Sequence, residues 1–331
     1  MNDQARPRVA VYSLGGTIAM TAQPDGTAAP TLSAKELLAA VPQISGLDVD
    51  LEVHDFRQVP GASLTFEDLF ALADEIKNAA ARGVDGVVVT QGTDTIEETS
   101  YLLDLRCRAD IPIVVTGAMR NPTMAGADGP ANILAALRVA SSPPAPRQSL
   151  VVFADEIHAT SRVRKSHSTS IAAFTSWPGA IGYVAEDQVV LTSAVPRSPE
   201  ILGPLQASPR TAMATITLGD DGEVLRALSG QVDGLVVAAF GAGHVPSACV
   251  PALNDLAQRI PVVLASRTSA GPVLTRTYGF PGSESDLLAR GMISAGALTP
   301  VKAKILLHTA LTVGMSKPEI RGLFDAANGA S

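Results

Sequence analysis

Four side chains in this sequence have types that could form a site for nucleophilic catalysis: Thr17, Thr93, Asp94 and Lys165. A threonine hydroxyl is a weak nucleophile and needs a base, and a buried lysine held by a carboxylate can be that base. Both threonines follow a glycine at the end of an expected strand, so their hydroxyls reach the sheet edge where ligands bind. The pattern therefore makes Thr17 a candidate nucleophile.

Each segment also has a simpler interpretation. Gly-Gly-Thr at Thr17 is common in phosphate loops and in ordinary turns. Asp94 or Thr95 is well placed to cap the helix that follows. Lys165 stands among other charges in Arg-Val-Arg-Lys-Ser-His, which is typical of a surface lysine. It becomes a candidate base only if the fold buries it beside Thr93 and Asp94, because desolvation then disfavours its charge.

Other chemistries lack their motifs. The chain has no Walker-type phosphate loop and no Gly-x-Ser-x-Gly elbow. Gly241-Ala-Gly243 begins like a dinucleotide-binding turn, but Pro246 stands where the third glycine belongs. The five histidines show no paired spacing with cysteine or carboxylate, so we expect neither a metal nor a cofactor.

Composition narrows the class of protein further. The 331 residues are 46% hydrophobic, enough for two buried cores, and the net charge is −7 with Lys and Arg scattered, which argues against nucleic-acid binding. No apolar run is long enough to span a membrane and no signal peptide is apparent, so we expect a cytoplasmic protein. Cys107 and Cys249 are expected to be buried thiols.

Short apolar runs alternate with helical patterns, which predicts an α/β fold. We expect a larger N-terminal domain (1–191) with a mostly parallel sheet flanked by helices, a proline-rich linker (192–211) and a smaller C-terminal α/β domain (212–331). The expected strands are Val9–Ser13, Val49–Phe56, Val87–Thr90, Ile113–Thr116, Leu150–Ala154, Gly234–Phe240 and Pro261–Ser266. The expected helices are Ser33–Val41, Thr65–Ala81, Thr95–Arg106, Gly129–Ala140, Val250–Arg259 and Pro300–Val313.

Taken together, these segments closely resemble the bacterial-type L-asparaginase/glutaminase family over nearly the whole chain. Two threonine signatures in order, with a lysine at the right distance, make a specific combination. The matching segments are Gly15-Gly16-Thr17-Ile18-Ala19, Gly92-Thr93-Asp94-Thr95 with Glu97-Glu98-Thr99, Thr116-Gly117-Ala118-Met119-Arg120 with Asp128, Gly129 and Asn132, Lys165, and Thr299–Leu307.

The resemblance implies that Thr17 forms an acyl-enzyme and that Thr93, Asp94 and Lys165 form one proton-handling triad. It also implies that Asp94 binds the substrate α-amino group and that a neighbouring subunit donates Glu284, whose alternative interpretation is a solvated loop carboxylate. The resemblance further implies a homotetramer built from tight dimers. Further substrate contacts implied by the resemblance are Gly61, Ala62, Ser63, Gly92, Ala118 and His244.

The sequence departs from the family pattern in four places. Gln91 replaces the usual histidine, and residues 21–32 lack the tyrosine that pairs with the first threonine. The carboxylate-binding loop reads Gly61-Ala62-Ser63, where Ser63 or backbone N–H groups are the candidates for the missing contact. His244 stands where an asparagine is usual, which would make binding depend on pH near neutrality.

These features lead to one preferred function and two alternatives. We expect hydrolysis of L-asparagine, with L-glutamine as the competing substrate, since one methylene changes binding by only about 1–3 kcal/mol. One alternative is an ammonia-supplying amidase of the amidotransferase type. The other is a catalytically silent amino-acid sensor, which the missing tyrosine favours and the intact triad opposes.

Overall fold

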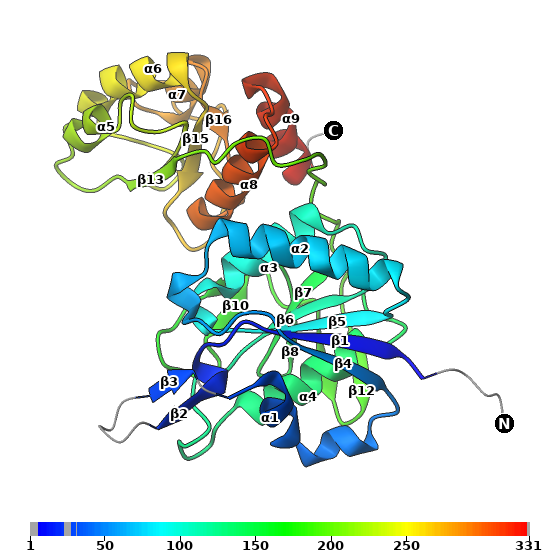
Figure 1. The fold of residues 1–331 in the computed structure, drawn as a ribbon. Coiled ribbons are helices and arrows are strands. Elements are labelled where there is room, and N and C mark those ends of the chain that lie inside the picture. The colour runs from blue at the N-terminus through cyan, green and yellow to red at the C-terminus, as the bar shows by residue number, and fades with distance from the viewer. Residues whose placement is uncertain (1–5, 23–27, 31, 330–331) are drawn as a thin grey trace. The chain divides into compact units, whose positions relative to one another are not determined.

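A computed structural model describes residues 6–22, 28–30 and 32–329 of the chain. The chain divides into two compact units, Met1–Glu200 and Ile201–Ser331, and each is described by itself (Figure 1). Residues 192–210 form neither helix nor strand.

The first unit is built on an eight-stranded sheet in the order β12-β11-β8-β7-β6-β5-β1-β4. The five strands from β7 to β4 are mutually parallel, and β8, β11 and β12 extend the sheet with antiparallel pairings. The strands are β1 (Arg8–Ser13), β4 (Asp50–Asp55), β5 (Gly86–Thr90), β6 (Ile113–Thr116), β7 (Ser149–Phe153), β8 (Glu156–Ala159), β11 (Gly182–Ala185) and β12 (Gln188–Leu191).

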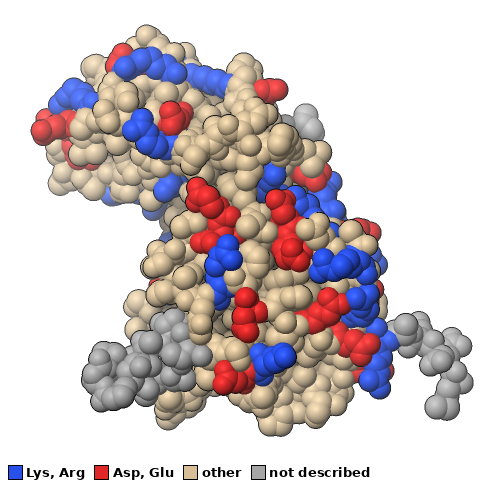
Figure 2. Space-filling view, in the orientation of Figure 1, with Lys and Arg blue, Asp and Glu red and all other residues tan. Residues whose placement is uncertain are grey.

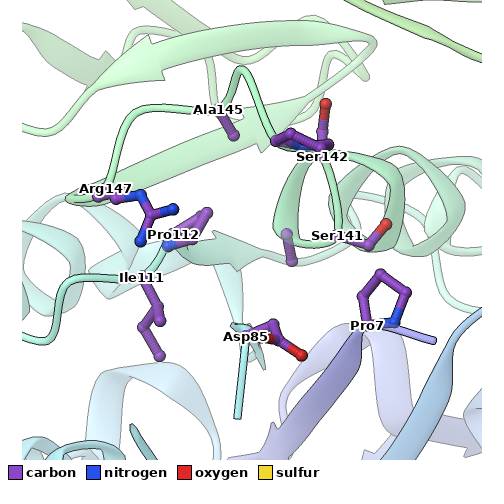
Figure 3. A pocket seen from close by; sticks show the side chains of 10 residues that line it. Pro7, Asp85, Ile111, Pro112, Ser141, Ser142, Ala145 and Arg147 are labelled. Carbon is purple, nitrogen blue, oxygen red and sulfur yellow. The ribbon is translucent and has the colours of Figure 1, made fainter. Parts of the chain in front are cut away.

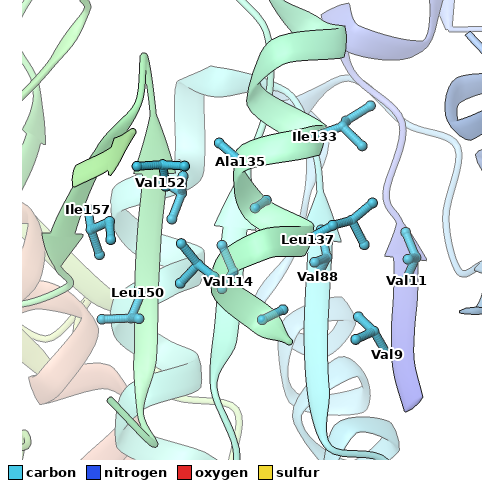
Figure 4. Packing of buried hydrophobic residues seen from close by; sticks show 14 of the residues in the cluster. Val9, Val11, Val88, Val114, Ile133, Ala135, Leu137, Leu150, Val152 and Ile157 are labelled. Carbon is cyan, nitrogen blue, oxygen red and sulfur yellow. The ribbon is translucent and has the colours of Figure 1, made fainter. Parts of the chain in front are cut away.

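Helices cover both faces of this sheet because its central strands are apolar on both sides. Val87 and Val89 of β5 pack in the cluster that includes α2 (Phe66–Ala81) and α3 (Ile96–Arg106). Val88 points to the opposite face, into the cluster that includes α1 (Ala34–Ala39) and α4 (Gly129–Ala140) (Figure 4). The expected fold class, an α/β unit with a mostly parallel sheet, is confirmed.

Local signals in the sequence explain where α2 begins and ends. The Thr65 hydroxyl accepts from the Asp68 N–H and the Asp68 carboxylate accepts from the Thr65 N–H, which is a capping box. Gly83 follows the helix with φ +85°, a conformation that glycine adopts without strain.

The structure corrects several expectations for the first unit. The helix expected at Ser33–Val41 is shorter, because Ser33 is its N-cap, in a capping box with Glu36, and residues 42–46 turn into a 3-10 helix. The antiparallel strands β8, β11 and β12 were not expected. Two small ribbons were also missed: β2 (Met20–Ala22) with β3 (Ala28–Pro30), and β9 (Val163–Lys165) with β10 (Phe174–Ser176).

The second unit has a four-stranded parallel sheet in the order β13-β14-β15-β16. The expected strands and helices of this unit are present to within about a residue, whereas β13, β16, α5, α7 and α9 were not expected. The elements are β13 (Thr211–Thr215), α5 (Glu223–Ala227), β14 (Gly234–Ala239), α6 (Val250–Arg259), β15 (Val262–Ser266), α7 (Glu284–Ala289), β16 (Ile293–Ser294), α8 (Pro300–Thr312) and α9 (Lys317–Ala327).

Two further expectations from the sequence concern the cysteines and membrane-spanning segments. Cys107 and Cys249 are free and buried, as expected. Among the residues that the structure describes, no helix is both long and apolar enough to cross a membrane.

Candidate active site

Lys165 is the centre of a hydrogen-bonded group at the carboxyl edge of the first unit's sheet. It ends β9, and its Nζ donates to Thr93 Oγ1 over 2.9 Å and to Asp94 Oδ1 over 2.7 Å. Its side chain is 17% exposed, so the surface-lysine interpretation is wrong. Thr93 is 5% exposed, whereas the Asp94 side chain is 64% exposed. The group therefore pairs a sheltered hydroxyl and amine with a carboxylate that solvent or a ligand can reach.

Glycines bring the Thr17 segment against the Thr93 segment. A Cβ on Gly16, at φ +82°, would lie 2.0 Å from the backbone nitrogen of Gly92. The Leu14 N–H also donates to the Thr90 carbonyl over 2.8 Å, which ties together the ends of β1 and β5. Thr17 begins the 3-10 helix Thr17–Ala19, directly after this contact. The two threonine loops therefore meet at one edge of the sheet, as parallel strands require.

The turn Gly61–Ser63 joins the same edge. A Cβ on Gly61 would lie 2.9 Å from the Gly92 carbonyl oxygen, so this turn also needs glycine for its close approach. Ala62 and Ser63 are exposed on the turn. The segment expected to hold the substrate carboxylate thus lies beside the two threonine loops.

The hydroxyl of Thr17 differs from that of Thr93 in its surroundings. Thr17 is half-buried, and among the residues that the structure describes no hydrogen-bond partner faces its hydroxyl. The segment 21–32, in which a tyrosine is usual, lies partly outside the described residues, at 23–27 and 31.

Polar side chains connect the loops beneath the site. Gln91 is fully buried, and its Nε2 donates to Thr95 Oγ1 over 3.2 Å and to the Gly92 carbonyl over 3.1 Å. The Thr95 hydroxyl donates to the Gly61 carbonyl over 3.0 Å. Thr95 occupies the N-cap position of α3 but makes no side-chain capping bond. Thr95 therefore holds the neighbouring turn in place, and its interpretation as a capping side chain is wrong.

The segment after β6 is held by its own backbone contacts. The Asp128 carboxylate accepts from the N–H groups of Met119 and Arg120 over 3.0 and 2.9 Å. Asn132 Nδ2 donates to the Gly117 carbonyl over 3.0 Å. The Ala118 methyl group packs in the hydrophobic core, so only backbone atoms of Ala118 can face a ligand. Asp128 and Asn132 consequently fix the loop that carries Ala118.

The second unit holds Glu284 and His244 together. Glu284 is the first residue of α7 and is 0% exposed, so its interpretation as a solvated loop carboxylate is wrong. Its carboxylate accepts from His244 Nε2 over 3.1 Å and from the N–H groups of Thr277 and Tyr278 over 2.9 and 2.8 Å. Burial disfavours its charge, but these donors outweigh burial and hold the pKa of Glu284 below its usual range.

Basic and acidic side chains are interspersed on the face drawn in Figure 2. No group of three or more metal-ligating side chains occurs in the described ranges. A hollow of about 240 Å³ lies at the amino edge of the first sheet (Figure 3). Its charged residues already have partners: Asp85 accepts from the Arg8 N–H, and Arg147 donates to the Asp110 carbonyl.

One contact at the site was missed by sequence reasoning. Glu97 Oε1 accepts the backbone N–H of Lys165 over 2.6 Å. The sequence indicates only that a glutamate in the first turn suits the helix dipole, and nothing in it links two residues 68 positions apart.

Both units of the chain match known protein families. Residues 8–197 match the family model for the asparaginase N-terminal domain, and residues 210–324 match that for the glutaminase/asparaginase C-terminal domain. A probable L-asparaginase of Deinococcus radiodurans is 37% identical over 330 residues, covering 96% of this chain and 97% of that protein. A glutaminase-asparaginase of Pseudomonas fluorescens biotype A is 30% identical, with 96% and 89% coverage.

A solved structure shows the same architecture. The crystal structure of a probable cytoplasmic L-asparaginase from Campylobacter jejuni aligns with a TM-score of 0.85 and 33% identity. The alignment covers 96% of this chain and 99% of that one.

Proposed function

Because the chain belongs to the bacterial-type L-asparaginase family, we propose that it hydrolyses L-asparagine to L-aspartate and ammonia through a threonine acyl-enzyme. The observation that carries the proposal is the Lys165 amine in hydrogen-bond contact with both Thr93 and Asp94. A hydroxyl, an amine and a carboxylate in contact are the parts that activate a weak oxygen nucleophile.

The first half-reaction forms the acyl-enzyme. Thr17 Oγ1 attacks the side-chain amide carbon, and its proton passes to the Thr93–Lys165 pair. The amide nitrogen takes this proton, the carbon–nitrogen bond breaks and ammonia leaves. Backbone N–H groups of the turns after β1 and β5 stabilise the oxyanion.

The second half-reaction regenerates the enzyme. Water attacks the ester carbon and gives one proton to the same pair. The bond between carbon and Thr17 Oγ1 then breaks, the threonine regains its hydrogen, and the new carboxylic acid leaves as aspartate. Asp94 binds the substrate α-amino group through its exposed carboxylate, since opposite charges attract across a site that solvent reaches.

Substrate choice between asparagine and glutamine is the finer part of the proposal. Relatives named as asparaginases and as glutaminase-asparaginases both resemble this chain. The two substrates differ by one methylene, worth about 1–3 kcal/mol in a fitted pocket. We propose asparagine as the preferred substrate, recognised by Gly61, Ala62, Ser63 and the backbone of Gly92 and Ala118.

We also propose a cytoplasmic homotetramer in which Glu284 and His244 of one subunit complete the site of another. The Campylobacter jejuni relative is named cytoplasmic, although a Haemophilus influenzae relative is named periplasmic. We also propose that the chain consists of an N-terminal domain (1–191), a linker (192–211) and a C-terminal domain (212–331).

Ammonia release tests the reaction. The purified protein is incubated with L-asparagine, L-glutamine or D-asparagine, beside Thr17→Ala and, as a matched control, Thr192→Ala, an exposed threonine of a loop. We expect the wild-type protein to release ammonia mainly from L-asparagine. Thr17→Ala should lose this activity, and Thr192→Ala should keep it. Full activity of Thr17→Ala would exclude Thr17 as the nucleophile and leave Thr93, the hydroxyl beside the lysine, in that role.

The same experiment separates the alternative functions. If calorimetry shows that L-asparagine binds but no ammonia is released, the amino-acid sensor is favoured.

The nucleophile itself is identified by mass spectrometry of acid-quenched enzyme. The acyl group adds its mass to the peptide that contains either Thr17 or Thr93.

A further inference from the structure

The backbone of Lys165 is hydrogen-bonded to α3, and its side chain is hydrogen-bonded to the turn before that helix. The Lys165 N–H donates to Glu97 Oε1 over 2.6 Å. Lys165 is the last residue of the three-residue strand β9, and it faces Phe174 of β10. Its N–H is directed to α3 instead of β10, so a side chain of the helix acts as its hydrogen-bond acceptor.

One five-residue segment therefore holds both ends of the lysine. Thr93 and Asp94 accept from Nζ, and Glu97 accepts from the main-chain nitrogen. A lysine side chain has four flexible carbons and loses about 2 kcal/mol of rotamer entropy when it is fixed. Fixing the backbone nitrogen against the same helix that follows Thr93 sets the distance that this flexible chain must span.

A second carboxylate of α3 holds the segment that precedes β9. Asp104 accepts from Thr160 Oγ1 over 3.1 Å and from the Ser149 N–H over 3.2 Å. Glu97 and Asp104 are seven residues apart, about two helical turns, so they lie on the same face of α3. That face thus binds the chain at Thr160 and again at Lys165.

We propose that Glu97 is a positioning residue that holds Lys165 at the distance needed for proton transfer from Thr93. The inference rests on the proposed function, because it concerns the rate at which the triad works. Glu97 acts through the Lys165 main chain and does not touch the substrate. Since a shift of about 1 Å in a catalytic group can lower a rate on the order of 100-fold, loss of this tether should appear in kcat.

The kinetic test uses Glu97→Ala, Glu97→Gln and the matched control Glu67→Ala. Glu67 is exposed and occupies the second position of α2, as Glu97 does in α3, so both glutamates interact alike with a helix dipole. We expect kcat for L-asparagine to fall about 10- to 100-fold in Glu97→Ala with KM changed less than about 3-fold. Glu97→Gln should keep kcat within about 3-fold of wild type, because the amide oxygen still accepts the N–H.

Two kinetic results would overturn the inference. One is a kcat of Glu97→Ala equal to that of Glu67→Ala. The other is a Glu97→Gln variant as slow as Glu97→Ala, which would assign the effect to charge. Thermal unfolding is recorded for all variants, and kcat is measured well below each midpoint so that folded protein is compared.

A readout without hydrolysis keeps this inference separate from the proposed function. The amine reagent trinitrobenzenesulfonate labels exposed lysines, and peptide mass spectrometry gives the labelling rate of Lys165, whose side chain is largely buried. We expect Lys165 to be labelled several-fold faster in Glu97→Ala than in wild type or Glu67→Ala. If wild type released no ammonia, the proposed function would fail, and an unchanged labelling rate would independently overturn the positioning role.

Discussion

Two carboxylates, one in each unit, illustrate opposite uses of the same chemical group. Asp94, at the carboxyl edge of the first sheet, is 64% exposed and pairs with one cation, Lys165. Glu284, at the start of α7 in the second unit, is 0% exposed and accepts from two backbone N–H groups and from His244. The exposed Asp94 carboxylate can still accept hydrogen bonds from a ligand, whereas the Glu284 carboxylate already accepts them from donors of its own chain.

Asp94 and Glu284 were both expected to bind the substrate, yet the two carboxylates differ in exposure and in their hydrogen-bond partners. The Asp94 side chain is 64% exposed, so solvent screens its ion pair and the cost of removing Asp94 should fall mainly on chemistry. A buried carboxylate that satisfies backbone donors contributes to folding, because its loss leaves those donors unpaired. If Glu284 also serves a neighbouring subunit, its own unit has positioned it before that subunit arrives.

The largest effect is expected for Asp94→Asn. We expect activity toward L-asparagine to fall on the order of 10²- to 10⁴-fold, because the variant loses the charge beside Lys165 and the proposed ammonium contact. The matched control is Asp74→Asn, since Asp74 is 60% exposed and pairs with Lys77 Nζ at 2.6 Å on the surface of α2. Steady-state kinetics and thermal melting decide the matter, and a large drop in melting temperature for Asp94→Asn alone would erase the contrast with Glu284.

The complementary change is Glu284→Ala. Its two backbone donors, on Thr277 and Tyr278, lose their acceptor, and we expect a loss of about 2–4 kcal/mol in the free energy of unfolding. Urea unfolding followed by circular dichroism measures it, with Glu223→Ala, an exposed glutamate that begins α5, as the control. Stability equal to that of the control would show that Glu284 is not structural.

A second measurement on the same variants addresses the shared site. Glu284→Gln retains an oxygen for the backbone donors and should be more stable than Glu284→Ala. If Glu284→Gln lowers activity while size-exclusion chromatography shows an unchanged oligomer, the carboxylate charge serves catalysis across subunits. Wild-type activity in Glu284→Gln would instead confine this residue to folding.

Acid should act on the two units in different pH windows. Burial lowers the pKa of His158, in β8 of the first unit, to about 4, from an ordinary value near 6.5. The unfolded chain therefore binds a proton before the folded one does, and stability falls between pH 6.5 and about 4 by about 3 kcal/mol. The pKa of Glu284 is lowered, so its contribution is present above its ordinary value of 4.5 and is lost only below it.

Hydrogen exchange measured as a function of pH tests this order. Amides of β7 and β8 should lose protection first on acidification, followed at lower pH by those of α7. His158→Gln, which removes the titrating ring next to Ser176, should flatten the profile of the first unit between pH 6.5 and 4. A profile unchanged by this substitution would contradict the assignment.

Predictability from sequence was uneven for a physical reason. Buried parallel strands such as Val87–Thr90 and helices with their own caps, such as Phe66–Ala81, follow from local patterns. The ribbon that carries Lys165 does not, since β9 has three residues and is held by Glu97 and by its pairing with β10. The burial of Glu284 also depends on donors from a loop before its helix. Residues of the site were recognisable by type and resemblance, while the contacts that place them are tertiary.

The smallest effect is expected beneath the site, at Thr95. Its hydroxyl donates to the Gly61 carbonyl and accepts from Gln91, so it joins the turn Gly61–Ser63 to the loop that carries Thr93. Thr95→Val removes both bonds at nearly constant volume and should cost about 1–2 kcal/mol of stability. Because the turn is the proposed carboxylate-binding segment, KM for L-asparagine should rise a few-fold while kcat changes little. Thr95→Ser keeps the hydroxyl and should restore KM. A fall in kcat as large as that of Asp94→Asn would mean that Thr95 belongs with the reacting groups and not with the scaffold under them.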